Sequence, residues 1–328
     1  MNISKLQEVT KVVVHANCPD GTASAIILRD ALKLSPEQIF FAQHTSPEYK
    51  EMKAEPGLLF CDCTPPQDRT QEFVDVGTIV LDHHKYSRDT VAAYGLNGAF
   101  ACKETDPEIS GAYLAYREVW KPLNDHRLAC GLLAADLDTW KFVRHFAAVA
   151  GIRDNWQLEH EYWKESGEQA ALLMFFNREF WMSKDLVWIA ENWDEKLSWI
   201  GPVLISNEND RSKSIAEKRW TYRTDSGLVI AIVPSRFISD ASDLLEDECD
   251  VVIGFSYTKN NPGCFPGLLL SLRSFGESFD CGKFCKANGG GGHLNAAGCE
   301  LETAEDTPNP YKFLCNKFDE YLRNGQEG

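Results

Sequence analysis

The sequence lacks any apolar run of the roughly 18 residues that a membrane-spanning helix needs, so we expect no membrane partner. Its first segment, MNISKLQEVTKVVVHANC, contains an acidic residue and has too short an apolar stretch for a secretory signal peptide. Basic residues are few as well, because 33 lysines and arginines stand against 49 aspartates and glutamates, a formal charge of −16. This balance argues against binding to long duplex nucleic acid, which depends on neutralising many phosphates. A short anionic substrate in a metal-loaded cleft remains compatible with it.

The cysteines lack the pattern of a disulfide framework. They number eleven, an odd count, and nothing in the sequence indicates export. We interpret them as free thiols in a reducing cytosol, which predicts a cytoplasmic protein. With 328 residues, 44% of them hydrophobic and 25% charged, the chain has the composition of a folded globular protein, and its length favours two domains.

Short apolar runs alternate with helical stretches in the N-terminal third of the chain. Three such runs, 11–15, 58–61 and 78–81, each stop at a polar residue. Strands that alternate with helices predict an α/β fold with a doubly wound parallel sheet. Open sheets of this kind place their sites at the carboxyl ends of the strands, so the polar residues after each run are the first candidates.

The character of the sequence changes further along the chain. Residues 108–200 are typical of helices and rich in tryptophan, and strand-like runs follow from residue 201. These runs are 203–206, 227–233, 250–255 and 267–273, with a loop or helix start expected at 207–218 and a last helix near 310–323. We therefore predict a domain of residues 1–160 with the parallel sheet, a helical connector of residues 161–200, and a smaller α/β domain of residues 201–328 with a mixed sheet.

A histidine and two carboxylates stand where the first two runs end. His15 and Asp20 lie five residues apart on a tight turn and can converge on one cation, or His15 can be a core residue while Asp20 caps a helix. Asp62 directly follows the buried run 58–61, where a carboxylate is costly unless it is paired or metal-bound. Its alternative role is that of a turn residue before the two prolines that follow.

The third run ends in Asp82-His83-His84, which is the strongest local signal in the sequence. Three ionisable groups close a buried run there, with no structural reason to cluster. Adjacent side chains on a strand point in opposite directions, so two of these groups share a site only if the chain bends at the strand end.

Glycine dominates residues 288–298, which read NGGGGHLNAAG. Glycines let the backbone approach a ligand closely, and a series of their N–H groups suits a phosphate. Four in succession cost much conformational entropy, which a purely structural loop rarely tolerates. The alternative is a flexible linker, but such linkers are not normally followed by His-x-x-Ala-Ala-Gly.

The ordered set of motifs resembles the DHH phosphoesterase superfamily with its associated C-terminal Gly-Gly-Gly-His domain, and within it the nanoRNase-like oligonucleotide phosphodiesterases. The resemblance covers most of the chain. In the family's order, the matching positions are HANCPDG at 15–21, Asp62, Asp82-His83-His84, Ser110-Gly111-Ala112 and GGGGHLNAAG at 289–298. One of these motifs would be weak evidence, whereas the ordered set is specific.

The resemblance implies a metal centre. The ligands of Mn²⁺ or Mg²⁺, as one or two ions, would be His15, Asp20, Asp62 and His83, with Asp62 as the bridging carboxylate. A further Asp would come from a fourth motif, for which Asp154 is favoured and Asp138 and Asp136 are alternatives. Many relatives also carry a second motif I Asp two residues after the first; Thr22 occupies that position here, so the second ion would be weaker, differently liganded or absent.

The resemblance also implies the remaining site residues. Asp82 would orient His83, and His84 would face the substrate phosphate, so Asp82 and His84 are the candidate catalytic residues. In the C-terminal domain, the candidate substrate-binding residues are Gly290, Gly291, Gly292, His293 and Arg273, which would hold a phosphate or the 3′ side of a nucleotide.

The function that the resemblance implies is metal-dependent hydrolysis of phosphodiester or phosphomonoester bonds in short oligonucleotides or (di)nucleotides, including exonuclease activity of the nanoRNase kind. Two alternatives stay open. One is an inorganic pyrophosphatase or exopolyphosphatase, which shares the N-terminal domain but usually not the glycine motif. The other is a non-catalytic nucleotide-binding module, for which the Thr22 departure is the argument. The sequence is also compatible with a homodimer.

Overall fold

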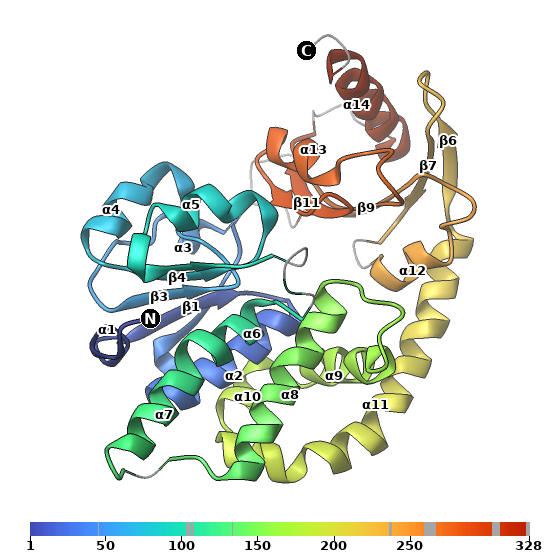
Figure 1. Ribbon diagram of the computed structural model, residues 1–328. Coiled ribbons are helices and arrows are strands. Elements are labelled where there is room, and N and C mark those ends of the chain that lie inside the picture. The colour runs from blue at the N-terminus through green and yellow to red at the C-terminus, as the bar shows by residue number, and fades with distance from the viewer. Residues whose placement is uncertain are drawn as a thin grey trace. The chain divides into compact units, whose positions relative to one another are not determined.

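The computed structural model describes residues 1–44, 46–102, 106, 108–132, 134–235, 238–258, 267–303 and 309–325. The chain divides into two compact units, Met1–Ile205 and Ser206–Gly328. Each unit has a sheet of its own, five parallel strands in the first and six mixed strands in the second, which confirms the predicted α/β class (Figure 1). Among the described residues, we find no helix with the length and apolarity to cross a membrane.

The parallel sheet of the first unit has the strand order β2-β1-β3-β4-β5. The strands are β1 (Lys11–His15), β2 (Ile39–Ala42), β3 (Leu58–Cys61), β4 (Ile79–Asp82) and β5 (Gly98–Phe100). The runs predicted at 11–15, 58–61 and 78–81 thus form the three adjacent central strands. Their side chains alternate between two apolar layers, because Val12 and Val14 pack in one core cluster and Val13 in another.

Helices cover both faces of this sheet, as the two clusters require. In Figure 1, α4 and α5 lie on one side of the strands and α2 and α6 on the other. The helices that alternate with the strands, and the first one after them, are α1 (Ile3–Gln7), α2 (Pro19–Leu32), α3 (Pro47–Lys50), α4 (Thr70–Asp75), α5 (Arg88–Ala92) and α6 (Gly111–Leu114). A π-helical turn, Ala115–Trp120, joins α6 to α7 (Lys121–Ala129). Then come α8 (Leu137–Asp154), α9 (Trp163–Phe175), α10 (Arg178–Met182) and α11 (Leu186–Glu217).

The long helix α11 differs from what the sequence predicts. Residues 203–206 were expected to form a strand and 207–218 a loop or helix start, but both segments lie in α11. A four-residue apolar run is too short to distinguish a strand from one face of a helix. Pro202 in the interior of the helix strengthened the wrong interpretation, since proline usually ends a helix.

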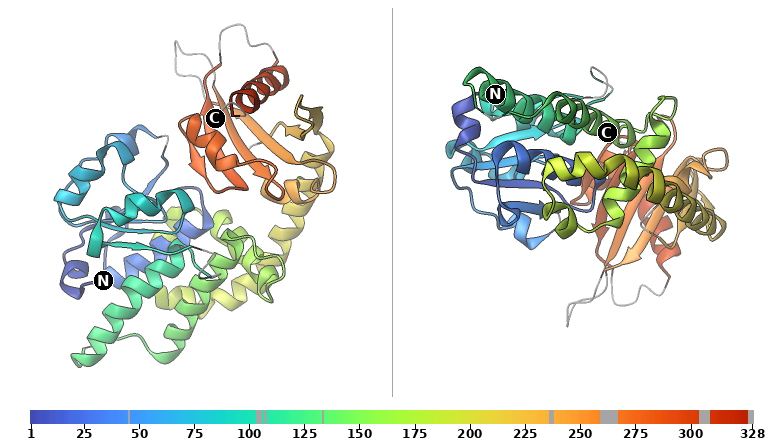
Figure 2. Two further views of the ribbon diagram at one scale, coloured as in Figure 1. Left: turned by 45° about the horizontal axis from the view of Figure 1, so that its top comes forward. Right: turned by 90° about the horizontal axis from the view of Figure 1, so that it is seen from below.

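The second unit has a mixed sheet with the order β10-β11-β9-β8-β7-β6. Among its described strand pairs, only β7 and β8 run parallel, and β6 and β10 are the two edges. The strands are β6 (Trp220–Arg223), β7 (Val229–Val233), β8 (Val251–Tyr257), β9 (Leu268–Ser274), β10 (Gly291–Gly292) and β11 (Ala296–Leu301). The helices are α12 (Ser239–Asp243), α13 (Cys281–Ala287) and α14 (Pro310–Gly325). The aromatic side chains of Phe284 and Phe318 join α13 and α14 in the core of this unit, and Figure 2 shows both helices beside its strands.

Candidate metal centre

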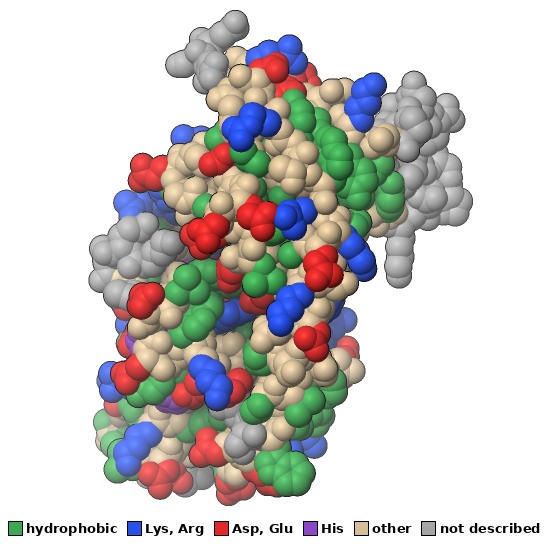
Figure 3. Space-filling model, turned by 90° about the vertical axis from the view of Figure 1, so that its right-hand side faces the viewer, with side chains coloured by type: hydrophobic (Ala, Val, Ile, Leu, Met, Phe, Trp, Pro, Cys, Tyr) green, Lys and Arg blue, Asp and Glu red, His purple; other side chains and the backbone are tan. Residues whose placement is uncertain are grey.

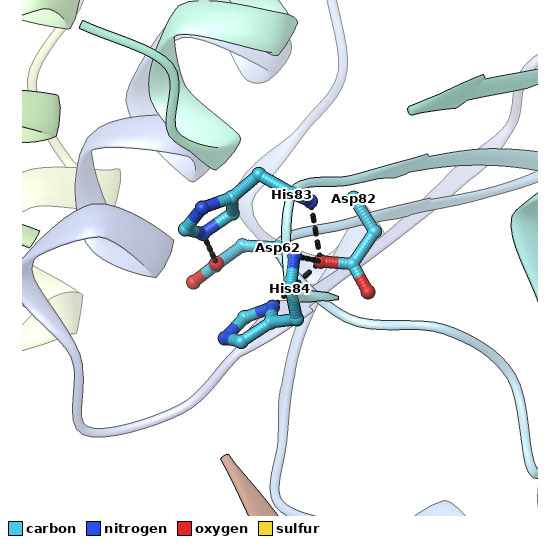
Figure 4. Close-up of side chains that lie close together, drawn as sticks. All are labelled: Asp62, Asp82, His83 and His84. Atoms are coloured by element: carbon cyan, nitrogen blue, oxygen red, sulfur yellow. Dashed lines mark hydrogen bonds and ion pairs between the residues drawn. The ribbon is translucent and has the colours of Figure 1, made fainter. Parts of the chain in front are cut away.

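The candidate site begins at the carboxyl ends of three neighbouring strands. His15 is the last residue of β1, Asp62 follows β3, and Asp82 is the last residue of β4. Because β1, β3 and β4 are adjacent and parallel, their ends meet at one edge of the sheet. Figure 4 shows the carboxylate of Asp62 beside the rings of His83 and His84, with Asp82 close to both histidines. This edge is where open α/β sheets place their sites.

The backbone bends where Asp62 leaves its strand. Asp62 has a φ of 61°, in the left-handed region that non-glycine residues rarely adopt, and its N–H donates to the carbonyl of Leu81 on β4 at 3.0 Å. The side chain is buried at 1% exposure. A strained backbone that holds a carboxylate inside the protein is typical of functional sites rather than of turns chosen for stability.

Asp20 enters the same site from the first turn of α2. Its Oδ2 accepts a hydrogen bond from the N–H of Gly111 at 2.7 Å, and its Oδ1 accepts one from the N–H of Ala112 at 2.9 Å. The Ser110-Gly111-Ala112 motif therefore supplies backbone donors that fix the Asp20 carboxylate. These two charge-assisted bonds hold the carboxylate in one orientation.

His83 is the common partner of three carboxylates. Its Nε2 lies 3.1 Å from Oδ1 of Asp62, 3.5 Å from Oδ2 of Asp154 and 3.7 Å from Oδ2 of Asp20. Asp20, His83 and Asp154 also form one of the groups whose ligand atoms lie within 4.8 Å of one another. One imidazole cannot neutralise three carboxylates, so this arrangement is typical of a group of metal ligands rather than of ordinary ion pairs.

A second group of donors lies on the other side of Asp62. Nδ1 of His15 and Sγ of Cys18 each lie 3.7 Å from Oδ2 of Asp62. The two oxygens of Asp62 thus face different groups, Oδ1 toward His83 and Oδ2 toward His15 and Cys18. Burial lowers the pKa of His15, and the positive charges that His84 and His44 can carry lower it further, to about 3. Its imidazole is therefore neutral, as a metal ligand must be.

The environment of the carboxylates indicates whether a cation fits at this site. Burial and the nearby Asp20 raise the pKa of Asp62 well above its usual value. Burial also raises the pKa of Asp154, although His83 opposes the shift, and Oδ2 of Asp154 is buried without a hydrogen-bond partner. A divalent cation would give this buried oxygen of Asp154 a partner and would offset the repulsion between the carboxylates. Carboxylate oxygens with imidazole nitrogens suit Mn²⁺ and Mg²⁺ better than soft metals, so the residues fit the implied ions.

The structure separates the three candidates for the fourth-motif Asp. Asp154 ends α8 and contacts His83, whereas Asp136 caps the start of α8 by accepting from the N–H of Thr139 at 2.7 Å. Asp138 is 94% exposed and pairs with Lys141. Asp138 and Asp154 are 16 residues apart on one helix, about 24 Å at the helical rise, so only one end of α8 reaches the cluster.

Asp82 contacts both histidines of the triplet. Its Oδ1 accepts from the backbone N–H of His83 at 2.8 Å and lies 2.6 Å from Nδ1 of His84, so its carboxylate holds the backbone of His83 and the ring of His84. Burial raises the pKa of Asp82, but His84 outweighs it and the pKa falls below its usual value. Burial likewise lowers the pKa of His84, but Asp82 reverses this and brings the pKa to about 9.

The candidates of the C-terminal unit lie on β9, on β10 and directly before and after β10. Arg273 donates from Nη2 to Oγ of Ser239 at 2.7 Å, and His293 donates its N–H to the carbonyl of Ala296 at 2.7 Å. Gly290 packs so closely on β11 that a Cβ there would lie 2.1 Å from the carbonyl oxygen of Gly298. Gly290 is therefore required because the backbone of β11 leaves no room for a side chain. A Cβ on Gly291 would meet open space, so backbone packing does not explain the glycine at that position.

One histidine of the site was missed by the sequence analysis. His44 follows β2, and its ring lies 6.0 Å from that of His15 and 4.9 Å from that of Tyr49. The ring of His84 is 6.5 Å from that of His15. His44, His15 and His84 therefore form a row of imidazoles beside the carboxylates. The apolar run 39–42 before His44 was the available signal, because it resembles the other strands that end in site residues.

Solved structures share this fold at low sequence identity. The DHH domain of a protein described as a member of a family of ribosomal proteins aligns with a TM-score of 0.52 and 12% identity, over 97% of this chain and 88% of its own. A pGpG-specific phosphodiesterase from Vibrio cholerae aligns with a TM-score of 0.48 and 12% identity, over 95% of this chain and 99% of its own. RecJ from Thermus thermophilus, in complex with Mn²⁺, aligns with a TM-score of 0.48 and 14% identity, over 97% of this chain and 52% of its own.

No protein-family model and no curated protein matches the sequence. The comparison with the DHH domain, which has the highest TM-score of these three, therefore bears on the fold. In the first unit, the residues that carry the resemblance in the sequence, His15, Asp20, Asp62 and Asp82-His83-His84, converge at the edge of the parallel sheet.

Proposed function

From the fold of a DHH domain, we propose that this chain is a metal-dependent phosphoesterase that hydrolyses phosphodiester or phosphomonoester bonds of short oligonucleotides or (di)nucleotides. The observation that carries the proposal is the convergence of Asp20, Asp62 and Asp154 on Nε2 of His83. So many acidic oxygens around one buried imidazole repel one another, and a bound cation would balance their charge. The same cation would let a protein of charge −16 bind an anionic substrate.

Two ion positions are supported by the way Asp62 divides its oxygens. We propose that Asp20, Asp62, His83 and Asp154 would hold one ion, and that His15 and Asp62 would hold a second. Thr22, which stands where many relatives have an Asp, donates its hydroxyl to the carbonyl of Cys18 at 3.0 Å. Because threonine has no carboxylate, the second ion position has one acidic ligand fewer than in those relatives, and we expect it to be the weaker one. A bound Mn²⁺ or Mg²⁺ supplies positive charge that polarises a phosphoryl group and makes hydroxide available at neutral pH.

His84 is the proposed residue for the substrate phosphate. Its Nδ1 lies 2.6 Å from Oδ1 of Asp82, so that carboxylate fixes the orientation of the ring. An imidazole fixed in this way donates to a non-bridging or leaving oxygen without first having to reorient. We propose that Asp82 acts as the positioning residue for His84.

The C-terminal unit is the proposed carrier of substrate specificity. We propose that Arg273, His293 and the segment Gly290–Gly292 contact a second phosphate or the 3′ side of a nucleotide. The N–H of Gly290 donates to the carbonyl of Cys285 at 2.8 Å, so this glycine contributes through its close backbone packing. Removing Arg273 is expected to raise KM more than it lowers kcat, because a group that binds the substrate without contacting the reacting atoms acts mainly on substrate affinity.

The test is turnover of a small substrate panel with Mn²⁺ and with EDTA. The panel contains a dinucleotide, a cyclic dinucleotide, a short RNA, a bisphosphorylated adenosine and pyrophosphate. We expect metal-dependent hydrolysis of a nucleotide substrate that is lost in Asp62→Asn and kept in Asp138→Asn, an exposed Asp on α8. Hydrolysis of pyrophosphate alone would replace the proposal by a pyrophosphatase. Nucleotide binding without any turnover would replace it by a non-catalytic binding module.

A further inference from the structure

A pocket of about 410 Å³ lies in the second unit, outside the residues considered so far. It is lined by side chains of the edge strand β6 and of the first turns of α14, and its volume is within the range of small-molecule sites. In the order of the sheet, β6 is at one edge and β10, with its glycines, is at the other. This pocket is therefore distinct from the proposed substrate-binding segment.

The wall of the pocket on β6 is aromatic. Trp220 and Tyr222 are two residues apart on the strand, and their rings are parallel to within 3° with centroids 6.1 Å apart. Tyr311 of α14 closes the wall, with its ring 5.8 Å from that of Trp220. The face that carries β6 is seen in Figure 3, where hydrophobic side chains gather in the upper part.

The exposure of Trp220 distinguishes this wall from ordinary core packing. Trp220 remains 43% exposed, whereas Trp120 and Trp181 of the first unit are fully buried. An indole that only covered the sheet would gain more free energy by full burial. A partly exposed indole on an edge strand is instead the kind of side chain on which nucleobases stack.

The rim of the pocket is polar and carries a cation. Asn309, Lys312 and Asn316 line it, and all three are exposed. Asn309 accepts from the N–H of Lys312 at 3.1 Å, which fixes the first turn of α14 beside the pocket. The ammonium of Lys312 suits a phosphate, and the amide of Asn316 can donate to and accept from the edge of a base.

The acidic neighbour of the pocket lies away from this rim. Oδ2 of Asp319 accepts a hydrogen bond from the hydroxyl of Tyr222, whereas its Oδ1 is buried without a hydrogen-bond partner. It is seven residues beyond Lys312 on α14, about 10 Å along the helix axis. An anion at Lys312 is therefore separated from the negative charge of Asp319 by about two turns of helix.

We propose that this pocket binds a nucleotide, with its base stacked on Trp220 and its phosphate at Lys312. The nucleotide is either free or the end of a short oligonucleotide, since both present the same base and phosphate. The inference concerns a second site and does not rest on the proposed hydrolytic activity. A sugar or a peptide would leave either the aromatic faces or the lysine unused.

The first experiment measures binding of AMP to the full chain by equilibrium dialysis in EDTA, with adenosine and ribose 5-phosphate as partial ligands. We expect AMP to bind and ribose 5-phosphate to bind far less, because it has no base. Trp220→Ala should weaken AMP binding about fivefold to a hundredfold, the range of base–aromatic stacking, and Trp220→Phe should restore most of it. Lys312→Ala should weaken binding of AMP but not of adenosine.

Matched controls separate this pocket from other nucleotide contacts. Trp199→Ala removes another exposed tryptophan, 80% exposed on α11, and should leave AMP binding unchanged. Lys317→Ala removes another exposed lysine of α14, one that pairs with Glu320, and should leave AMP binding unchanged as well. If Trp220→Ala keeps full AMP affinity, or if Lys317→Ala weakens AMP binding as much as Lys312→Ala does, the proposal is wrong.

The second experiment locates the ligand. The full chain is irradiated with 8-azidoadenosine 5′-monophosphate in EDTA, and the labelled peptides are mapped by mass spectrometry. We expect label on residues 220–222 or 311–316, and its loss on competition with AMP. Competition by the trinucleotide pApApA at lower concentration than AMP would identify the end of an oligonucleotide as the ligand, and equal or weaker competition would identify the free nucleotide. Label confined to other peptides would overturn the proposal.

Discussion

At the scale of single residues, the cluster around His83 is unfavourable as long as only the protein is considered. Asp20 and Asp62 are each 1% exposed, and Asp154 adds an acidic oxygen with no hydrogen-bond partner. Each of these groups lost solvation by water on folding, and their mutual repulsion adds to that cost. The free energy of folding of the metal-free protein is therefore less favourable than it would be without this cluster. Such a loss of stability is common at functional sites.

Asp154→Asn tests this exchange directly. The amide removes one negative charge from the cluster, so we expect the metal-free protein to melt about 2 °C higher than the wild type, a gain of under 1 kcal/mol. We expect the stabilisation by saturating Mn²⁺, which amounts to about 3 kcal/mol at a hundredfold excess over Kd, to be largely lost. Thermal melts in EDTA and in Mn²⁺ measure both.

The control for this variant is Asp138→Asn, which lies on the same helix, is exposed and pairs with Lys141 on the protein surface. It should keep the wild-type response to Mn²⁺. A lower melting temperature of Asp154→Asn in EDTA, together with an unchanged response to Mn²⁺, would contradict the account of the cluster.

Asp82 and His84 lead to a second prediction at this scale. Asp82 holds the ring of His84 through Nδ1, so Asp82→Asn should disturb the orientation of His84 more than the carboxylates around His83. We expect kcat to fall about 10- to 100-fold, the usual effect of losing a partner behind a site residue. Mn²⁺ affinity, measured by calorimetry, should change by less than kcat. A loss of Mn²⁺ affinity that equals or exceeds the loss of kcat would contradict the positioning role.

At the scale of elements, Gly111 links α6 to the metal centre. A Cβ on Gly111 would lie 2.4 Å from Cβ of Asp62 and 2.9 Å from Oδ2 of Asp20. Gly111→Ala would have to push α6 away from both carboxylates, so we expect a loss of about 1–3 kcal/mol in the free energy of unfolding and weaker Mn²⁺ binding. Denaturant unfolding and calorimetry measure the two effects.

Gly167→Ala in α9 is the matched control, because its Cβ would meet only Cδ1 of Ile205 at 3.4 Å, an ordinary contact. It should be neutral or stabilising by up to about 1 kcal/mol, since alanine favours helix. Equal destabilisation by the two substitutions would show that the close approach at Gly111 is not what holds the site.

The elements also show what the sequence could and could not predict. Apolar runs before polar residues marked β1, β3 and β4, because fully buried parallel strands are continuous apolar segments. They did not mark β5 (Gly98–Phe100), a three-residue edge strand whose side chains are only half-buried. The helical nature of residues 203–206 was missed for a related reason, since a run of this length carries no periodicity.

The same limit applies to the candidate site. Strand ends placed His15, Asp62 and Asp82 near one another from sequence alone, because neighbouring parallel strands share one edge. The contact of Asp154 with His83 depends on which end of α8 packs against the sheet, and both ends carry an Asp. Tertiary packing determines which end of α8 lies at the site, and the local pattern of residues in α8 does not. His44 was overlooked because its strand, β2, was not recognised.

At the scale of the whole molecule, the two units divide the proposed work. The metal-centre residues Asp20, Asp62, His83 and Asp154 lie in Met1–Ile205, and the nucleotide pocket at Trp220 lies in Ser206–Gly328. The second unit also has a core of its own, in which Phe284 and Phe318 stack with centroids 4.4 Å apart. A unit of this size buries enough apolar surface to fold alone.

The fragment of residues 206–328 should therefore fold independently. We expect a cooperative thermal transition and a dispersed amide NMR spectrum, although the part of α11 that it retains should fray, since a helix end without its tertiary contacts is marginal in water. Its affinity for AMP should equal that of the full chain, and Trp220→Ala should reduce it by the same factor. The fragment should hydrolyse nothing on the substrate panel, because every carboxylate around His83 is missing from it. A fragment that is unfolded would contradict the independence of this unit, and a folded fragment without AMP affinity would place the nucleotide contact of the full chain elsewhere.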